Sequence, residues 1–564
     1  MNRFLAATFV AASLSSLSLS AQQKSIDNPV TQAMLEVYAE ELASNPRDAD
    51  IYFRRANEYY KFDQYLRALS DVDKTLEFAP MSNRDLRYQA YMLRADIYQM
   101  LDRHRDALSD FSEALKLDPA SFMALYQKAN EEYKLGDYSS AKADYTRLRA
   151  LNPRSAEALT GLARVAVKEN NLGLASEYMD GAVQMMSADS DIYIRRASVR
   201  RMLGNNTGAV EDLLMSISID NNTRAFQELI DIANIDYPAV ISGLSTSISY
   251  APQQGMLYYI RGFIAQAHDH YASALVDYRK LIEQQMYEYP GLYNSIAQCE
   301  FALCQYSKAL DDVEFAISTD GGKNGEFFIT KARIYHALGK HDEALKALED
   351  ANMRGYNSAA INELKAIVDF SSGNFADAND IYASMIIEHP ETMRNYIYRA
   401  WVMEDGLHQA ENALALYNRV VDITNEAALD AKLSSVGGEV AETIPALSAI
   451  QSYRGFALLF SGDRDGALNW AADLQRDYRD SDGNLNYIVA CLYAQASAQD
   501  SLTQAEKSSL TARSLTALEN ALKLGYANLY EITVADVGHV SLAPIRKDIN
   551  FSDLISRYSY LFEQ

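Results

Sequence analysis

The chain has 564 residues, of which 48% are hydrophobic and 23% are charged, and its formal net charge is −24. This length exceeds one ordinary globular core, so we expect several domains or a repeat array. The acidic balance argues against a nucleic-acid partner and a polybasic membrane-surface role, because both require clustered Lys and Arg, whereas it leaves basic protein partners open.

Residues 1–21 have the composition of a secretory signal peptide. Arg3 supplies the positive flank, the stretch from Phe4 to Leu19 is apolar and small, and Ala21 offers a small residue for cleavage. The alternative is an uncleaved anchor, but the serines make this stretch too polar to span a membrane. No later stretch contains the roughly 18 consecutive apolar residues that a membrane-spanning helix needs. We predict cleavage near Ala21, no membrane span, and a periplasmic or secreted mature chain that starts with a helical lead-in at 22–48.

From residue 49 onward the sequence repeats itself, mostly at intervals of 34 or 35 residues. Small residues recur in a common context at Ala68, Ala107, Ala141, Ala175, Ala209, Ala274, Ala309, Ala344, Ala378, Ala413 and Ala467. A second small-residue series stands twelve places earlier in most units, at Ala56, Ala95, Ala129, Ala163, Ala197, Gly262, Ala297, Ala332 and Ala366. Apolar residues around both series have the i, i+3, i+4, i+7 spacing of helices, so each unit is predicted to be a pair of helices.

Turn residues separate the predicted helices. One glycine position lies between the two halves of a unit, where the left-handed backbone conformation ends a helix, at Gly136, Gly204, Gly339, Gly373 and Gly462. Prolines end the second helix at Pro80, Pro119, Pro153 and Pro390.

This pattern of aromatic, small and proline positions resembles the tetratricopeptide repeat family over roughly residues 30 to 525. The resemblance implies an all-α fold, an α-solenoid wound as a right-handed superhelix from about 12 helix–turn–helix repeats that bury each other's faces. We expect the array at 49–425 with a degenerate repeat at 222–250, and at 426–447 either an insertion or a hinge between two arrays. Further repeats are expected at 448–525 with a loop insertion at 497–510, followed by a C-terminal cap at 526–564.

Charged residues recur at two repeat positions. The acidic series is Asp71, Asp110, Asp144, Asp212, Asp277 and Asp312, and the basic series is Arg55, Arg94, Lys128, Arg196, Arg261, Lys331 and Arg399. An ion-binding or substrate ladder is one interpretation. We favour structural charge pairing between helices, because a binding site would normally break the repeat.

No motif in the sequence indicates catalysis, a cofactor or a metal site. His268 and His270 flank Asp269 at a predicted turn without further ligands at suitable spacing, so a solvated turn is the preferred interpretation. The glycine-rich stretch 321–325 lacks the Gly-Lys-Ser/Thr ending of a phosphate loop and is predicted to connect two helices. Cys299 and Cys304 would point about 140° apart on a helix, which argues against a disulfide between them.

The resemblance implies that the first helix of each repeat lines the concave groove of the superhelix. The predicted partner-binding stripe on those helices comprises Phe53, Asn57, Tyr60, Tyr126, Asn130, Tyr133, Tyr259, Phe263, His336 and Trp401. The chain has 38 tyrosines, and exposed aromatic residues of this kind are enriched at protein interfaces. Packing between repeats is the alternative role for any single tyrosine.

The function that we expect is a non-enzymatic scaffold of the cell envelope that grips a protein or peptide in this groove. A second hypothesis is binding of a glycan or envelope polymer through exposed tyrosines. A third is an enzyme whose site lies in the irregular segments at 426–447 or 497–510. Self-association through the ends of the array is a further hypothesis. The repeat architecture does not decide among these hypotheses, because a fold by itself does not determine function.

Overall fold

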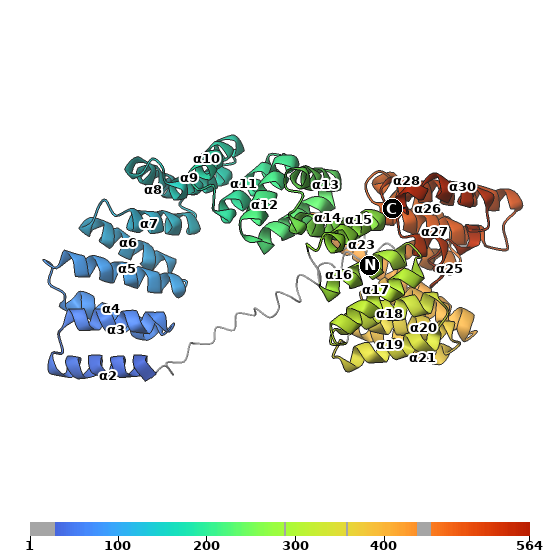
Figure 1. Cartoon of the computed structure of the whole chain (residues 1–564), viewed down its shortest axis with the longest axis horizontal. Coiled ribbons are helices and arrows are strands. Elements are labelled where there is room, and N and C mark those ends of the chain that lie inside the picture. The colour runs from blue at the N-terminus through green and yellow to red at the C-terminus, as the bar shows by residue number, and fades with distance from the viewer. Residues whose placement is uncertain (1–28, 287–288, 357–358, 437–452, 564) are drawn as a thin grey trace. The chain divides into compact units, whose positions relative to one another are not determined.

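The computed structural model describes residues 29–286, 289–356, 359–436 and 453–563. Within these ranges all regular structure is helical, and helices that follow one another in the chain pack against each other in pairs (Figure 1). The predicted all-α solenoid of helix pairs is therefore confirmed, while the handedness of its superhelix stays a prediction. The chain divides into two compact units at Ser249 and Tyr250, which we call the N-terminal and C-terminal units.

The N-terminal unit contains a leading helix, five helix pairs and the kinked helix α13 in its described residues. In chain order the helices are α2 (Pro29–Ser44), α3 (Ala49–Lys61), α4 (Tyr65–Phe78), α5 (Arg84–Met100), α6 (His104–Leu117), α7 (Phe122–Lys134), α8 (Tyr138–Leu151), α9 (Ala156–Lys168), α10 (Leu172–Met185), α11 (Ser190–Met202), α12 (Asn206–Asp220) and α13 (Thr223–Tyr250). The pairs from α3 to α10 follow one another in chain order along the unit (Figure 1). The degenerate repeat is the kinked α13, which Asp236 interrupts with non-helical backbone angles just before Pro238.

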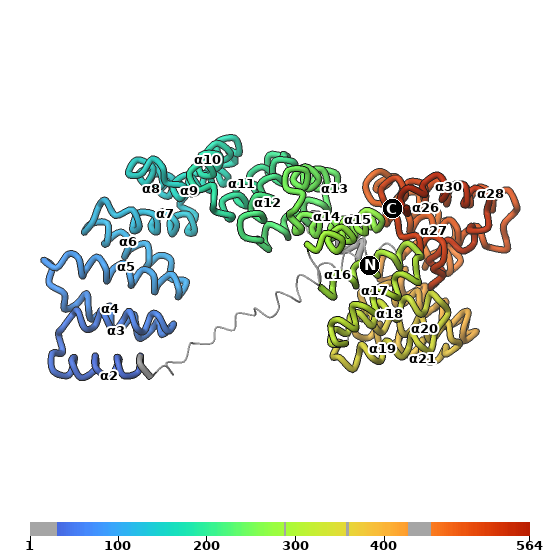
Figure 2. The backbone as a smooth tube through the Cα atoms, viewed as in Figure 1, coloured from blue at the N-terminus to red at the C-terminus, as the bar shows by residue number. Residues whose placement is uncertain are grey.

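The C-terminal unit continues with seven helix pairs and a non-repeating end in its described residues (Figure 2). The elements are α14 (Gly255–Ala267), α15 (Tyr271–Glu283), α16 (Pro290–Ala302), α17 (Tyr306–Thr319), α18 (Gly325–Ala337), α19 (His341–Met353), α20 (Ala359–Ser371), α21 (Phe375–Glu388), α22 (Met393–Trp401), η2 (Val402–Gly406), α23 (Ala410–Val436), α25 (Arg454–Phe460), α26 (Arg464–Tyr478), α27 (Gly483–Ser497), α28 (Gln504–Lys523), α29 (Leu529–Thr533), η3 (Ala543–Ile545), α30 (Ile549–Arg557) and η4 (Ser559–Leu561).

The turns inside the repeats confirm the predicted left-handed position. All five predicted glycines have positive φ, from 71° at Gly339 to 97° at Gly462. In other repeats Asp, Asn, Cys or His occupies the corresponding turn and also has positive φ, as in Asp63, Asp102, Asn170, Asp269, Cys304 and His408. Asn and Asp tolerate this conformation better than most non-glycine residues, which explains why the turn persists where the glycine is absent.

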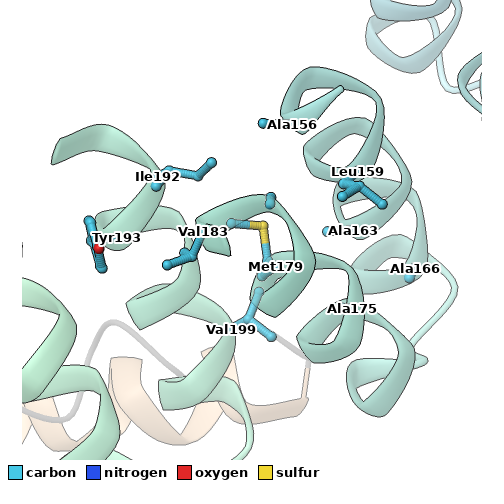
Figure 3. Close-up of a cluster of buried hydrophobic side chains, with 11 residues drawn as sticks. Ala156, Leu159, Ala163, Ala166, Ala175, Met179, Val183, Ile192, Tyr193 and Val199 are labelled. Carbon is cyan, nitrogen blue, oxygen red and sulfur yellow. The ribbon is translucent and has the colours of Figure 1, made fainter. Parts of the chain in front are cut away.

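The core lies between repeats, where small residues let helices approach closely. The predicted alanine series are buried, as at Ala163 and Ala175, and larger side chains from the next repeat fill the remaining space. In the cluster of Figure 3, Met179 and Val183 of α10 pack between α9 and α11. Neighbouring repeats thus bury each other's apolar faces, as expected for repeats too small to fold alone.

The recurring charges form ion pairs between the two helices of a repeat. The closest N–O distances are 2.6 Å for Arg55–Asp71, 2.7 Å for Arg94–Asp110, 2.5 Å for Lys128–Asp144, 2.6 Å for Arg196–Asp212 and 2.6 Å for Arg261–Asp277. Later repeats change partners: Arg279 pairs with Asp312, Lys331 pairs with Glu314, and Arg399 donates to the amide oxygen of Asn379. The structural interpretation of the charge series is confirmed.

The structure differs from several predicted boundaries. Helix α23 continues through 426–436, while the remainder of the predicted insertion, 437–447, lies outside the described residues. The division between compact units falls at 249/250 and not at 426–447. The loop predicted at 497–510 is shorter, because a capping box formed by Thr503 and Glu506 starts α28 at Gln504.

The predicted C-terminal cap is only partly a cap. Helix α30 packs near α28. There the Glu519 carboxylate accepts hydrogen bonds from Arg557 at 3.4 Å and from the Tyr558 hydroxyl at 3.2 Å. Residues 525–546 instead return to earlier repeats of the C-terminal unit. The stretch 321–325 connects α17 to α18 as predicted, and all three cysteines are free. Among the described helices, none has the length and apolar character required to cross a membrane.

Candidate binding surface

The first helices of successive repeats meet along one face of each unit, which we call the first-helix face. Polar side chains connect these helices. In the N-terminal unit Gln99 donates to Glu131 at 2.7 Å, and in the C-terminal unit Gln266 donates to Gln298 at 2.9 Å. The predicted binding stripe lies on the same helices, so its residues can be compared with these contacts.

The stripe residues on α3 interact mainly within their own repeat. Phe53, Asn57 and Tyr60 are half-buried. The Asn57 amide donates to the carbonyl oxygen of Phe53 at 2.8 Å, and the rings of Tyr60 and Tyr65 lie 5.9 Å apart. These contacts fix the positions of the side chains, but they do not place charged or hydrogen-bonding groups from different repeats next to one another.

The stripe residues on α7 form a cluster with a residue that the sequence analysis missed. Asn130 Oδ1 accepts hydrogen bonds from the Tyr145 hydroxyl at 2.7 Å and from Arg164 of α9 at 3.2 Å. The Arg164 guanidinium lies 4.0 Å from the centre of the Tyr133 ring, in cation–π contact. Tyr126 is half-buried against the same core. We call Tyr126, Asn130, Tyr133 and Arg164 the Arg164 cluster.

Arg164 lacks the carboxylate partner that the recurring basic residues of the N-terminal repeats have. It is half-exposed and has no carboxylate at ion-pair distance among the described residues, whereas Lys128 of the preceding repeat contacts both Asp144 and Glu132. Burial raises the pKa of Tyr145 well above its ordinary value, so its hydroxyl remains a neutral donor to Asn130. The cluster therefore presents an unneutralised cation between aromatic rings.

A simple sequence signal points to Arg164. It stands 34 residues after Asn130, which is one repeat period, and it thus occupies the corresponding position of the next first helix. Extending the predicted stripe by one repeat would have included it.

Of the predicted stripe in the C-terminal unit, Tyr259 and Phe263 contact each other, whereas His336 and Trp401 lie in other repeats. Tyr259 packs 6.3 Å from Phe263 and 6.4 Å from Tyr278. The ring of His336 lies 5.4 Å from that of His341, and burial lowers the pKa of His336 to about 4. Trp401 is only 6% exposed, and its ring lies 3.7 Å from that of Phe370. Trp401 therefore belongs to the packing of this unit.

The His268–His270 segment forms the turn between α14 and α15, as predicted, but it is not fully solvated. His270 is half-buried, and a Cβ atom added at Gly525 would overlap its imidazole ring. Burial lowers the pKa of His270 below its ordinary value. The described residues contain no cluster of three or more potential metal ligands.

A buried carboxyl pair lies between α16 and α17. Arg279 contacts Glu300 at 2.5 Å and Asp312 at 2.7 Å. One guanidinium neutralises one carboxylate, and burial together with the neighbouring Asp312 raises the pKa of Glu300 to about 7. Because Glu300 is 1% exposed, the pair belongs to the interior and offers no open site.

Comparison with known families identifies the repeat type. Models of the tetratricopeptide repeat match residues 88–121, 126–193 and 325–353. Over these segments the chain matches the tetratricopeptide repeat. The match at 126–193 covers the whole Arg164 cluster, so this cluster is built on two successive tetratricopeptide repeats.

Solved tetratricopeptide proteins show distant similarity. YrrB, described as a TPR protein with an unusual peptide-binding site, is 21% identical over 34% of this chain and 96% of its own, with a TM-score of 0.28. A tetratricopeptide repeat protein from Parabacteroides merdae is 16% identical over 57% of this chain and 98% of its own, with a TM-score of 0.28. Yeast Tom70 is 16% identical over 76% of this chain and 99% of its own, with a TM-score of 0.32. Comparison with curated proteins gives no significant match.

Proposed function

We propose that this protein is a non-enzymatic scaffold that binds a segment of another protein on the first-helix face of its N-terminal unit. Tetratricopeptide repeats generally mediate protein–protein interaction, which supports this class of function. The observation that carries the proposal is the Arg164 cluster, where a half-exposed guanidinium without a carboxylate partner among the described residues lies over Tyr133.

The chemistry of the cluster favours a segment that carries a carboxylate. A carboxylate at Arg164 would form a charge-assisted hydrogen bond, while Asn130 and Tyr133 hold the guanidinium in place. Tyr126 and Tyr133 provide half-buried ring surface beside it, suited to an apolar neighbour in the bound segment. An acidic side chain or a chain-terminal carboxylate would satisfy the same requirement.

Peptide selection on the full-length mature chain tests the proposal. Peptides selected on the wild type should be enriched in a carboxylate, and Arg164→Gln should weaken their binding by about tenfold or more through the lost charge-assisted contact. The matched control is Arg105→Gln, which removes an exposed arginine from the second helix α6. Equal affinities for the wild type and Arg164→Gln would exclude the cluster as the binding site.

We further propose that the protein acts outside the cytoplasm, in the periplasm or after secretion. The basis is the signal-like sequence of residues 1–21. N-terminal sequencing of the protein from its source cells should find a chain that starts at Gln22. A chain that retains Met1 and fractionates with cytoplasmic proteins would contradict this location.

A further inference from the structure

Residues 525–546 follow the last repeat helix, α28, and return to the first repeats of the C-terminal unit. The ring of Tyr530 in α29 lies 4.6 Å from Phe301 of α16 and 6.5 Å, edge-on, from Tyr306 of α17. Gly525 lies so close to His270 that any side chain at this position would overlap the imidazole. About 200 residues of chain separate these partners.

The same segment also contacts the later repeats of the unit. Gly538 lies against the Tyr398 ring of α22, with no room for a Cβ atom. His539 lies 3.5 Å from Asp405 of η2 and 5.0 Å, between ring centres, from Phe460 of α25. One non-repeating stretch therefore bridges the beginning of the C-terminal unit to its last repeats.

Several side chains hold this stretch, since Tyr487 of α27 donates to the carbonyl oxygen of Glu531 at 2.9 Å and Gln495 donates to that of Ser541 at 3.0 Å. Helix α29 has only five residues, so its terminal carbonyl groups have no partners within a continuing helix. Arg546 donates to the carbonyl oxygens of Ile532 at 3.1 Å, Val534 at 3.0 Å and Glu531 at 3.3 Å, and it also contacts that of Ala535. The conformation that presents Tyr530 thus depends on Arg546 together with Tyr487 and Gln495 of α27, and not on a long helix.

We propose that residues 525–546 are an internal ligand that occupies a docking surface formed by Phe301, Tyr306 and Tyr398. The occupant seen here defines the partner that this surface fits, namely a short helical segment that presents a tyrosine to the Phe301–Tyr306 pair. Such a partner binds only after the internal segment leaves. This inference concerns the C-terminal unit and does not depend on binding at the Arg164 cluster.

Tethering explains why the surface is closed in the free protein. A covalently linked segment competes at an effective concentration on the order of millimolar, above that of most free partners. Short helices and irregular backbone open at lower free energy than packed repeat helices. The segment also buries Ile532, Leu542 and Ile545, so its release exposes these side chains, and the proposal requires that α16, α17 and α22 remain folded when it leaves.

The chain contains its own reporter of release. Cys304 lies in the turn between α16 and α17, is half-buried, and interacts with the Thr533 side chain of the segment. Burial raises the pKa of the Cys304 thiol, which slows its alkylation, because the thiolate is the reactive form. Cys299 is fully buried in α16 and serves as the internal control for unfolding, whereas the buried Cys491 of α27 lies near Glu531 and Arg546 of the segment.

The experiment measures alkylation of the three cysteines in the full chain with iodoacetamide. We expect Arg546→Gln to accelerate labelling of Cys304 by about tenfold or more, because the segment loses several hydrogen bonds to a charged group. Labelling of Cys299 should not change. Arg557→Gln, which removes only the contact to Glu519 near the same end of the chain, should behave as the wild type.

A synthetic peptide with the sequence of residues 525–548 completes the test. Added to Arg546→Gln, it should restore slow labelling of Cys304, and it should bind that variant but not the wild type at the same concentration. Three results would overturn the proposal: unchanged Cys304 labelling, equal acceleration at Cys299, or failure of the peptide to protect Cys304. Equal acceleration would show that the segment is an inseparable part of the core.

Discussion

Replacement of Glu300 by glutamine should stabilise the protein at alkaline pH. The carboxyl group is 1% exposed and shares Arg279 with Asp312, and its pKa is raised to about 7 from an ordinary value of 4.5. Between these two values the folded state holds a proton that the unfolded state has released. The stability contributed by this proton is fully present below about pH 4.5 and is lost as pH rises through about 7.

The magnitude follows from this difference in pKa. One pKa unit corresponds to about 1.4 kcal/mol, so ionisation of Glu300 in the folded state costs about 3 kcal/mol at alkaline pH. Glutamine has nearly the same shape and no charge to desolvate. We therefore expect Glu300→Gln to exceed the wild type in local stability by about 3 kcal/mol near pH 8, and by little near pH 5.

Hydrogen exchange of the amides in α16 and α17 provides the assay, because repeat arrays need not unfold in a single step. Comparing variant and wild type at the same pH removes the pH dependence of intrinsic exchange. Glu283→Gln, at an exposed position of α15, is the control and should change nothing. If Glu300→Gln exchanges faster than the wild type near pH 8, the ionised Glu300–Arg279 pair is stabilising and the reasoning is refuted.

Three further substitutions test the packing, each by chemical denaturation followed through the helical circular dichroism. Tyr145→Phe should destabilise the N-terminal unit by about 1 kcal/mol, because Asn130 loses its 2.7 Å hydrogen bond. Gly262→Ala should cost about 1–3 kcal/mol, since the new Cβ atom would lie 2.7 Å from Tyr278. Arg94→Ala should cost about 3 kcal/mol by leaving its buried aspartate partner unpaired, and an unchanged midpoint would contradict the structural role of that ion pair.

The repeating part of the fold could be predicted because every unit supplies the same information again. One alanine in a helical pattern is weak evidence for a repeat. Ala68 and its equivalents, however, recur in phase with the turn residues and the charged residues, so an irregular unit does not change the overall prediction. The ion pairs were accessible for the same reason: Arg55 and Asp71 stand 16 residues apart, and that separation recurs at Arg94–Asp110 and Arg261–Asp277. Periodicity thus reports pairings that lie within a repeat.

Contacts that occur once leave no periodic signal. Nothing in the spacing of Tyr530, Phe301 and Tyr306 indicates that they meet, because more than 200 residues separate Tyr530 from both. Trp401 occupies a stripe position by register, yet the structure buries it against Phe370. The position of a residue within the repeat identifies the helix face on which it lies. Whether its side chain is buried depends on the neighbouring repeat and, for Trp401, on the π-helical η2 that follows α22.

A binding site in a repeat array is best sought at a charged residue that lies outside the positions where the repeat forms its own ion pairs. Arg94, Lys128 and Arg196 each form an ion pair with a carboxylate of their own repeat, so their charges are neutralised within the fold. Arg164 stands on the first-helix face and meets an amide and an aromatic ring instead. The chain has a net charge of −24, so carboxylates are abundant in it. An external carboxylate at Arg164 would therefore meet a cation that no described carboxylate neutralises.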